Sequence, residues 1–173
     1  RAFSGAVLDL GDGARLEVLS VSPRGAVLLV EWKGFRALLP VGMNFDTLAE
    51  LENGKTVGLV TALLLADSGY AQVNPAEWIN FLNPQLVILS VAAGDINGLP
   101  PQETLEALGE RALLRTDSNG WIEVSSDGQQ MWVQVQRGGP ATPIPTITPT
   151  PTETLPATEP PATEAPVLET PVP

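Results

Sequence analysis

The first forty residues are patterned for antiparallel strands. Short apolar runs occur in two pairs, Ala6–Leu10 with Ala14–Val21 and Gly25–Trp32 with Phe35–Leu39. The dipeptides Asp12-Gly13 and Lys33-Gly34 lie between the members of each pair, and such dipeptides supply the positive φ angles of tight turns. The pattern predicts two β-hairpins. The second hairpin should end at Pro40, because proline cannot donate to a sheet ladder.

The middle of the chain has three helical patterns. Asn44–Leu51 is predicted as a helix capped by Asn44, with Phe45, Leu48 and Leu51 on its inward face. A second helix should begin with Asn74 as its cap and Pro75 at the first helical position. A third is predicted from about Gln102 to Leu108, and Gly109 should end it.

Continuous apolar runs separate these helices. Gly58–Ala66 and Leu86–Val91 lack alternation, which is typical of strands buried on both faces of a sheet. Strands that alternate with helices in this way predict an α/β fold. In such folds the loops after the strands commonly carry the functional residues. Asp67-Ser68-Gly69 and the loop Ala92–Pro101 are therefore the candidate positions to consider first.

Three short strands are predicted to close the domain: Ala112–Thr116, Trp121–Ser126 and Gln129–Gln136. If Asp127-Gly128 forms a two-residue turn, Ser125 faces Gln130 and Glu123 faces Trp132. One face of this hairpin is then apolar and belongs to the core. The other is polar except for Trp121 and Trp132, which lie diagonally opposite and form a candidate binding surface.

The last part of the chain has a different composition. From Gly138 to Pro173 it is dominated by Pro, Thr and Glu, and it has neither helical nor strand periodicity. Such a segment cannot bury enough apolar surface to offset the entropy of ordering it. We therefore divide the chain into one folded domain, residues 1–137, and a disordered tail, residues 138–173. Thr-Pro runs of this kind often act as extended stalks.

Charge and composition exclude several classes of function. The formal net charge is −11, and a surface this acidic disfavours direct binding to nucleic acid. The chain has no Cys and no His. It therefore lacks thiolate chemistry, a Ser-His-Asp triad and the commonest transition-metal ligand. No run of apolar residues is long enough to cross a membrane as a helix.

Two segments resemble a known family. Gly98-Leu-Pro-Pro-Gln-Glu-Thr-Leu-Glu-Ala-Leu108 is similar to a Gly-His-Pro-x-x-Glu-x-Leu-x-x-Leu stretch, and Arg115-Thr-Asp-Ser-Asn-Gly-Trp-Ile-Glu-Val124 is similar to the run that follows it. Both occur in metallo-β-lactamase-fold domains, and the sequence of the two segments most resembles the C-terminal domain of ComEC-type competence proteins, which take up DNA. The resemblance covers about Ala6 to Val124. It implies the C-terminal half of a metallo-β-lactamase-like αββα sandwich.

The same resemblance locates vestigial positions of the active face. The family binds zinc or manganese, and its Gly-His-Pro histidine falls on Leu99. Its His-His-Gly-Ser loop falls on Asp67 and Ser68, and its bridging Asp falls on Met43, or on Gly42 if the gap moves by one. Its His-x-His-x-Asp-His motif has no counterpart in this chain. We therefore expect no metal, no cofactor and no catalytic residue. Asp67, Asp95 and Asp117 are interpreted as turn residues, and Asp117–Gly120 lacks the ligands of an EF-hand.

Three functional hypotheses remain open. The chain is a catalytically inactive ComEC-like domain with a structural or binding role linked to DNA uptake, or a cell-surface binding module that uses Trp121 and Trp132 on a Thr-Pro stalk. Alternatively, it is the second half of a metal-dependent hydrolase whose ligands lie upstream. All three place it outside the cytoplasm, at the cell surface, secreted or as part of a membrane protein. Half a sandwich leaves one sheet face uncovered, so we also expect self-association, a missing N-terminal half as partner, or an exposed apolar face.

Overall fold

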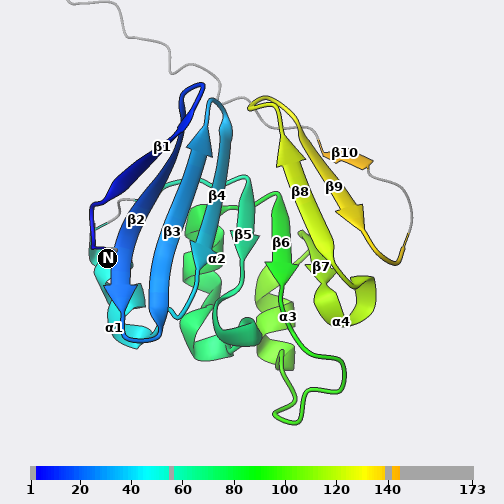
Figure 1. The fold of residues 1–173 in the computed structure, drawn as a ribbon. Coiled ribbons are helices and arrows are strands. Elements are labelled where there is room, and N and C mark those ends of the chain that lie inside the picture. The colour runs from blue at the N-terminus through cyan, green and yellow to red at the C-terminus, as the bar shows by residue number, and fades with distance from the viewer. Residues whose placement is uncertain (1–2, 55–56, 139–141, 145–173) are drawn as a thin grey trace, which may run out of the picture.

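The computed structural model describes residues 3–54 and 57–138, together with the backbone of 142–144. The protein is an α/β structure with one large sheet, a set of short helices and a smaller sheet (Figure 1). The tail predicted to be disordered, apart from Gly138 and the backbone of 142–144, lies outside the described residues. None of the helices in the described part is long and apolar enough to span a membrane.

The large sheet has seven strands in the order of the sequence, β1-β2-β3-β4-β5-β6-β7. Strands β1 to β4 pair antiparallel, whereas β4 to β7 pair parallel. The carboxyl ends of the four parallel strands therefore lie at one edge of the sheet. The strands are β1 Val7–Gly11, β2 Ala14–Ser22, β3 Gly25–Trp32, β4 Phe35–Pro40, β5 Ala62–Leu64, β6 Leu86–Leu89 and β7 Ala112–Arg115.

Both predicted hairpins are confirmed. Asp12 and Gly13 join β1 to β2 with φ angles of 51° and 79°, and Lys33 has a φ of 52° between β3 and β4. Positive φ at these positions matches the twist of the flanking strands. Strand β4 ends at Pro40, as the sequence predicts.

Three helices, α1 Phe45–Gly54, α2 Ala76–Leu82 and α3 Gln102–Leu108, cover one face of the large sheet (Figure 1). Single turns η1 Ala66–Gly69, η2 Ala71–Val73 and α4 Thr116–Asn119 lie between the elements. The main core fills the space between this face and the helices. Leu38, Ile79, Leu82, Val87 and Leu89 are among its fully buried members.

Helix boundaries agree with the sequence better than helix faces do. Asn44 caps α1, because its Oδ1 accepts the backbone N–H of Thr47 at 2.9 Å. Gly109 ends α3, as predicted. The inward face predicted for α1 is wrong at Phe45, which is 53% exposed, and Thr47 is buried instead.

Two other predictions in this region are wrong. The apolar run Gly58–Ala66 forms only the three-residue strand β5, because the side chain and backbone of Arg36 hold the residues that precede it. Asn74 does not cap α2, and Pro75 occupies the position before the first helical residue. The side chain of Asn74 is used elsewhere, in the loop after β5.

The smaller sheet has the order β10-β9-β8, with β8 Ile122–Ser126, β9 Met131–Val135 and β10 Thr142–Ile144. Its apolar face is the predicted one and packs against β4 to β7 of the large sheet. This second core includes Ile122, Val124, Met131, Val133 and Val135.

The predicted register of this hairpin is wrong. Ser125 pairs with Trp132 and Glu123 with Gln134, so the turn is longer than two residues. The carboxylate of Asp127 accepts the backbone N–H groups of Gln129 and Gln130 at 2.8 and 2.7 Å, which stabilises the longer turn. The shift equals two residues, and side chains alternate with a period of two, so the apolar face is unchanged.

Candidate functional site

The loops after the parallel strands gather at the carboxyl edge of the large sheet. Arg24, in the turn between β2 and β3, touches two of them. Its Nη2 donates to Asp67 Oδ1 at 2.9 Å, and its carbonyl carbon lies 2.5 Å from the point that a Cβ on Gly42 would occupy. Gly69, at the end of η1, similarly approaches Pro100. The edge therefore brings together the backbone segments that carry all four vestigial positions.

Met43 does not face this edge as a ligand would. Its side chain is 1% exposed and belongs to the main core under the helices. The neighbouring Gly42 has a φ of 71° and its carbonyl accepts the hydroxyl of Ser22 at 3.0 Å. Neither residue offers a side-chain donor atom that a hard metal ion prefers.

Asp67 and Ser68 form a tight turn. Their φ angles are 45° and 53°, a left-handed conformation that non-glycine residues seldom adopt. The carboxylate of Asp67 is paired with Arg24, and both side chains are substantially exposed, so the ion pair contributes less than about 1 kcal/mol. Ser68 has no histidine to activate it, because the chain contains none.

The buried amide of Asn74 holds this turn in place. Asn74 Oδ1 accepts the N–H of Ala66 at 2.9 Å, and its Nδ2 donates to the carbonyls of Ala66 and Tyr70 at 3.0 and 2.7 Å. Backbone strain persists where surrounding contacts over-determine it. Sequence reasoning missed this role, because Asn before Pro is also the signature of a helix cap.

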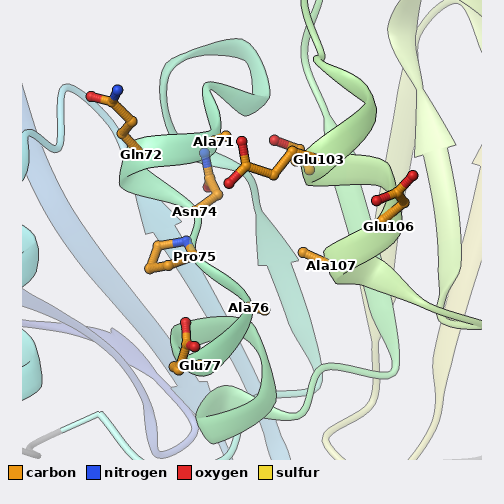
Figure 2. Close-up of a pocket in the computed structure, with 10 residues that line it drawn as sticks. Ala71, Gln72, Asn74, Pro75, Ala76, Glu77, Glu103, Glu106 and Ala107 are labelled. Atoms are coloured by element: carbon orange, nitrogen blue, oxygen red, sulfur yellow. The ribbon is translucent and has the colours of Figure 1, made fainter.

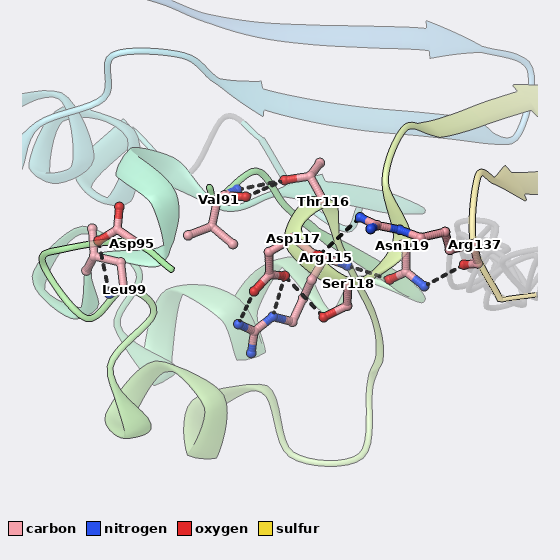
Figure 3. A network of polar contacts seen from close by, with 9 residues as sticks. All are labelled: Val91, Asp95, Leu99, Arg115, Thr116, Asp117, Ser118, Asn119 and Arg137. Carbon is pink, nitrogen blue, oxygen red and sulfur yellow. Dashed lines mark hydrogen bonds and ion pairs between the residues drawn. The ribbon is translucent and has the colours of Figure 1, made fainter. Parts of the chain in front are cut away.

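Leu99 contributes to packing rather than to a polar site. Its side chain is half-buried and packs against the main core. The carboxylate of Asp95 shapes the loop. It accepts the backbone N–H of Asn97 at 2.8 Å, and that of Leu99 at 3.4 Å (Figure 3). Asp95 therefore acts as the turn residue that its sequence context predicts.

A second set of polar contacts surrounds Asp117. Arg115 donates from Nε and Nη2 to the two carboxylate oxygens of Asp117 at 3.0 and 2.7 Å (Figure 3). Thr116 Oγ1 accepts the N–H of Val91 at 2.9 Å and donates to its carbonyl at 2.8 Å. The loop after β6 is thereby tied to the turn after β7. Since Arg115 engages both oxygens of Asp117, the contacts are those of a structural turn.

The hydrogen bonds from Arg115 hold the pKa of Asp117 below its usual value of 3.8. A carboxyl whose folded pKa is lowered adds stability that is present above the unfolded pKa and lost as the pH falls through the folded one. We expect Asp117→Asn to unfold more easily than wild type at pH 7, by less than about 1 kcal/mol. The difference should shrink on acidification below about pH 4. Urea unfolding of both proteins across pH 2.5–7 measures it, and a difference independent of pH would contradict the assignment.

The residues at this edge do not fit a zinc or manganese ion. Such sites need about three or four protein ligands. Within the described residues, no three His, Cys, Asp or Glu side chains lie close enough together to hold a metal. The positions that correspond to ligands in the resembling family carry a buried thioether, a leucine, a serine and a carboxylate paired with arginine.

The two candidate tryptophans are not side by side. Trp121 is 52% exposed and precedes β8, whereas Trp132 is half-buried in β9, opposite Ser125. Trp121 lies four positions before Ser125, which corresponds to roughly 13 Å along a strand. The diagonal pair predicted from sequence is therefore wrong, since it assumed the other register.

A hollow that sequence reasoning did not identify lies between η2, α2 and α3. It has a volume of about 470 Å³, and the carboxylates of Glu77, Glu103 and Glu106 lie along its walls (Figure 2). Its walls repel anions. Glu103 and Glu106 are one helical turn apart, which is the only sequence signal that could have pointed to it.

Comparison of the chain with models of protein families, with curated proteins and with solved structures finds no match in any of the three. The resemblance of residues 6–124 to a metallo-β-lactamase-fold domain therefore stays a prediction.

Proposed function

We propose that this chain is a catalytically inactive module with a structural or binding role outside the cytoplasm. Its scaffold resembles the second half of a metallo-β-lactamase-fold domain of the ComEC type. Because of this resemblance, we assign the proposed role to DNA uptake. One observation carries the proposal. The carboxyl edge has the loops of an α/β active site, but Met43 is buried in the core, Leu99 packs against it, and Asp67 is paired with Arg24.

The chemistry available at this edge supports binding over catalysis. No histidine can serve as a general base. The carboxylates of Asp67 and Asp117 are each engaged by an arginine, and that of Asp95 accepts backbone N–H groups of its own loop. A net charge of −11 disfavours contact with DNA itself, so the role in uptake that we propose is contact with another protein.

Metal binding and hydrolysis test the proposal directly. Purified full-length chain, dialysed against zinc or manganese and then passed through a desalting column, should retain far less than one metal per chain. It should also cleave plasmid DNA and a nitrophenyl phosphodiester no faster than buffer alone does. Stoichiometric metal, together with cleavage that Asp67→Asn abolishes, would show a working hydrolase and refute the inactive assignment.

A further inference from the structure

The outer face of the large sheet, opposite the helices that the structure describes, carries an apolar groove. The groove has a volume of about 240 Å³ and only apolar side chains line it. Val30 and Leu39 come from the neighbouring strands β3 and β4, Ile88 comes from β6, and Val124 comes from β8 of the smaller sheet. Apolar surface of this kind is a common mark of an interaction site.

Strand register extends this apolar floor beyond the groove. Leu16 pairs with Val30, Val30 with Ala37, and Ala37 with Ala62, so these side chains form one row on the outer face. The smaller sheet covers β4 to β7 but not β2 and β3 (Figure 1). Among the described residues, the established contact between the two sheets therefore continues into a row of the same chemistry, in which Leu16 and Val30 are half-buried.

The smaller sheet has a free edge on this side. Strand β8 is the terminal strand of the order β10-β9-β8, so within the described residues no strand pairs with its other edge. Trp121 O accepts the N–H of Gln136 toward β9. Because backbone direction alternates along a strand, the N–H and C=O groups of Ile122 and Val124 point toward the free edge.

We propose that an extended strand of another protein adds to the free edge of β8 and lies over the groove. Its backbone pairs with Ile122 and Val124, and alternate apolar side chains contact Val30 and Leu39. This is the β-augmentation mode of peptide recognition. The proposal rests on the binding role proposed above.

Charge defines the outward side of this partner strand. Glu123 lies between Ile122 and Val124 and faces away from the large sheet, where it is exposed. Opposite charges directly across a ladder stabilise a sheet, and the whole chain is strongly acidic. The partner is therefore an extended segment with apolar residues at alternate positions and Lys or Arg between them.

Two other occupants fit less well. The first is the tail, in which no more than four residues separate neighbouring prolines between Pro145 and Pro173. Because proline has no backbone N–H to donate, such a segment is a poor strand for a ladder. A second copy paired through β8 would be related by a twofold axis perpendicular to the smaller sheet. Both large sheets would then lie on the same side and collide, because the uncovered strands of each already occupy that side.

Peptides with blocked backbone donors test the ladder. The probe is a fluorescent eight-residue peptide with Val at alternate positions and Lys or Thr between them, titrated with full-length protein. Two further versions carry N-methyl groups, one on every Val and one on every intervening residue. We expect the parent peptide to bind and only one methylated version to lose affinity, by about tenfold or more. No binding of the parent peptide, or equal affinity of the two methylated versions, would overturn the proposal.

A groove variant with a matched control locates the contact. Val30→Asp should abolish binding of the parent peptide, whereas Ile96→Asp, at a loop side chain that is 97% exposed, should leave it unchanged. Circular dichroism checks that both variants fold. If Val30→Asp does not fold, the comparison of the two N-methylated peptides with the wild-type protein still tests the proposal. If the wild-type protein is a dimer and Val30→Asp makes it monomeric, the groove binds a second copy of this chain, and the proposal is overturned.

The metal and hydrolysis assays do not involve this groove. If the peptide fails to bind and no hydrolysis occurs, only the strand-addition proposal is lost. If the peptide binds and the protein also hydrolyses DNA, only the inactive assignment is lost.

Discussion

Replacing Asn74 with alanine is expected to lower the free energy of unfolding by about 3 kcal/mol. The side chain of Asn74 is buried, and the substitution removes partners from the N–H and the carbonyl of Ala66, which is also buried. The carbonyl of Tyr70 loses one partner but retains the N–H of Val73 at 3.2 Å. A buried backbone group without a partner costs about 1–3 kcal/mol. Urea denaturation followed by circular dichroism measures the loss.

Two further variants make this test specific. Gln72→Ala changes an exposed side chain in the same segment and should alter stability by no more than about 0.5 kcal/mol. Asn74→Asp keeps an acceptor for the N–H of Ala66 but loses both donations, so it should also destabilise strongly. If Asn74→Ala cost less than about 1 kcal/mol, the amide would not be what holds the turn at Asp67 and Ser68.

This role of Asn74 marks a limit of what the sequence can predict. Asn followed by Pro is typical of a helix start, and a helix does start at Ala76. The amide instead bonds to Ala66, eight residues earlier in the chain. A side chain that can cap a helix can equally bond a loop, and only the path of the chain decides between the two.

Local signals account for most of the fold that was predicted correctly. Asp12-Gly13 and Lys33-Gly34 set the hairpins, Asn44 caps α1 and Gly109 ends α3, because each of these acts through its own neighbours. The register of β8 and β9 depends on the side chain of Asp127, which builds a longer turn than Asp-Gly alone predicts. Trp132 therefore lies two residues further along β8 than expected.

The candidate sites also divide into those that residue identity alone could predict and those that depend on the fold. Residue identity alone predicts no metal ligand at Leu99 and only a soft thioether at Met43, and the structure adds that Met43 lies in the main core and Leu99 packs against it. The groove was harder to predict, since it depends on register. Val30, Leu39 and Val124 lie in separate elements. Strand pairing places Val30 and Leu39 on one face of the large sheet, and only the packing of the smaller sheet brings Val124 beside them.

Arg36 carries the other large expected effect. Its Nη1 and Nη2 donate to the carbonyls of Leu59 and Val57, both at 2.6 Å, and its Nε donates to Glu31 at 2.8 Å. These bonds tie the backbone of residues 57–59 to a side chain of β4, and these residues form no strand although the apolar run Gly58–Ala66 has the pattern of one. Arg36→Met should lower the free energy of unfolding by about 2 kcal/mol, since two carbonyls lose charged donors. Thermal and urea unfolding measure the loss.

Arg15 supplies the matched control, because it bonds the same carboxylate from the other side. Its Nε donates to Glu31 Oε2 at 2.7 Å, but its side chain is largely exposed and, among the described residues, donates to no carbonyl. Arg15→Met should therefore cost less than about 1 kcal/mol. The difference between the two variants isolates the bonds to Val57 and Leu59 from the ion pair with Glu31. Equal losses would mean that the ion pair, and not the anchoring of this segment, is what Arg36 contributes.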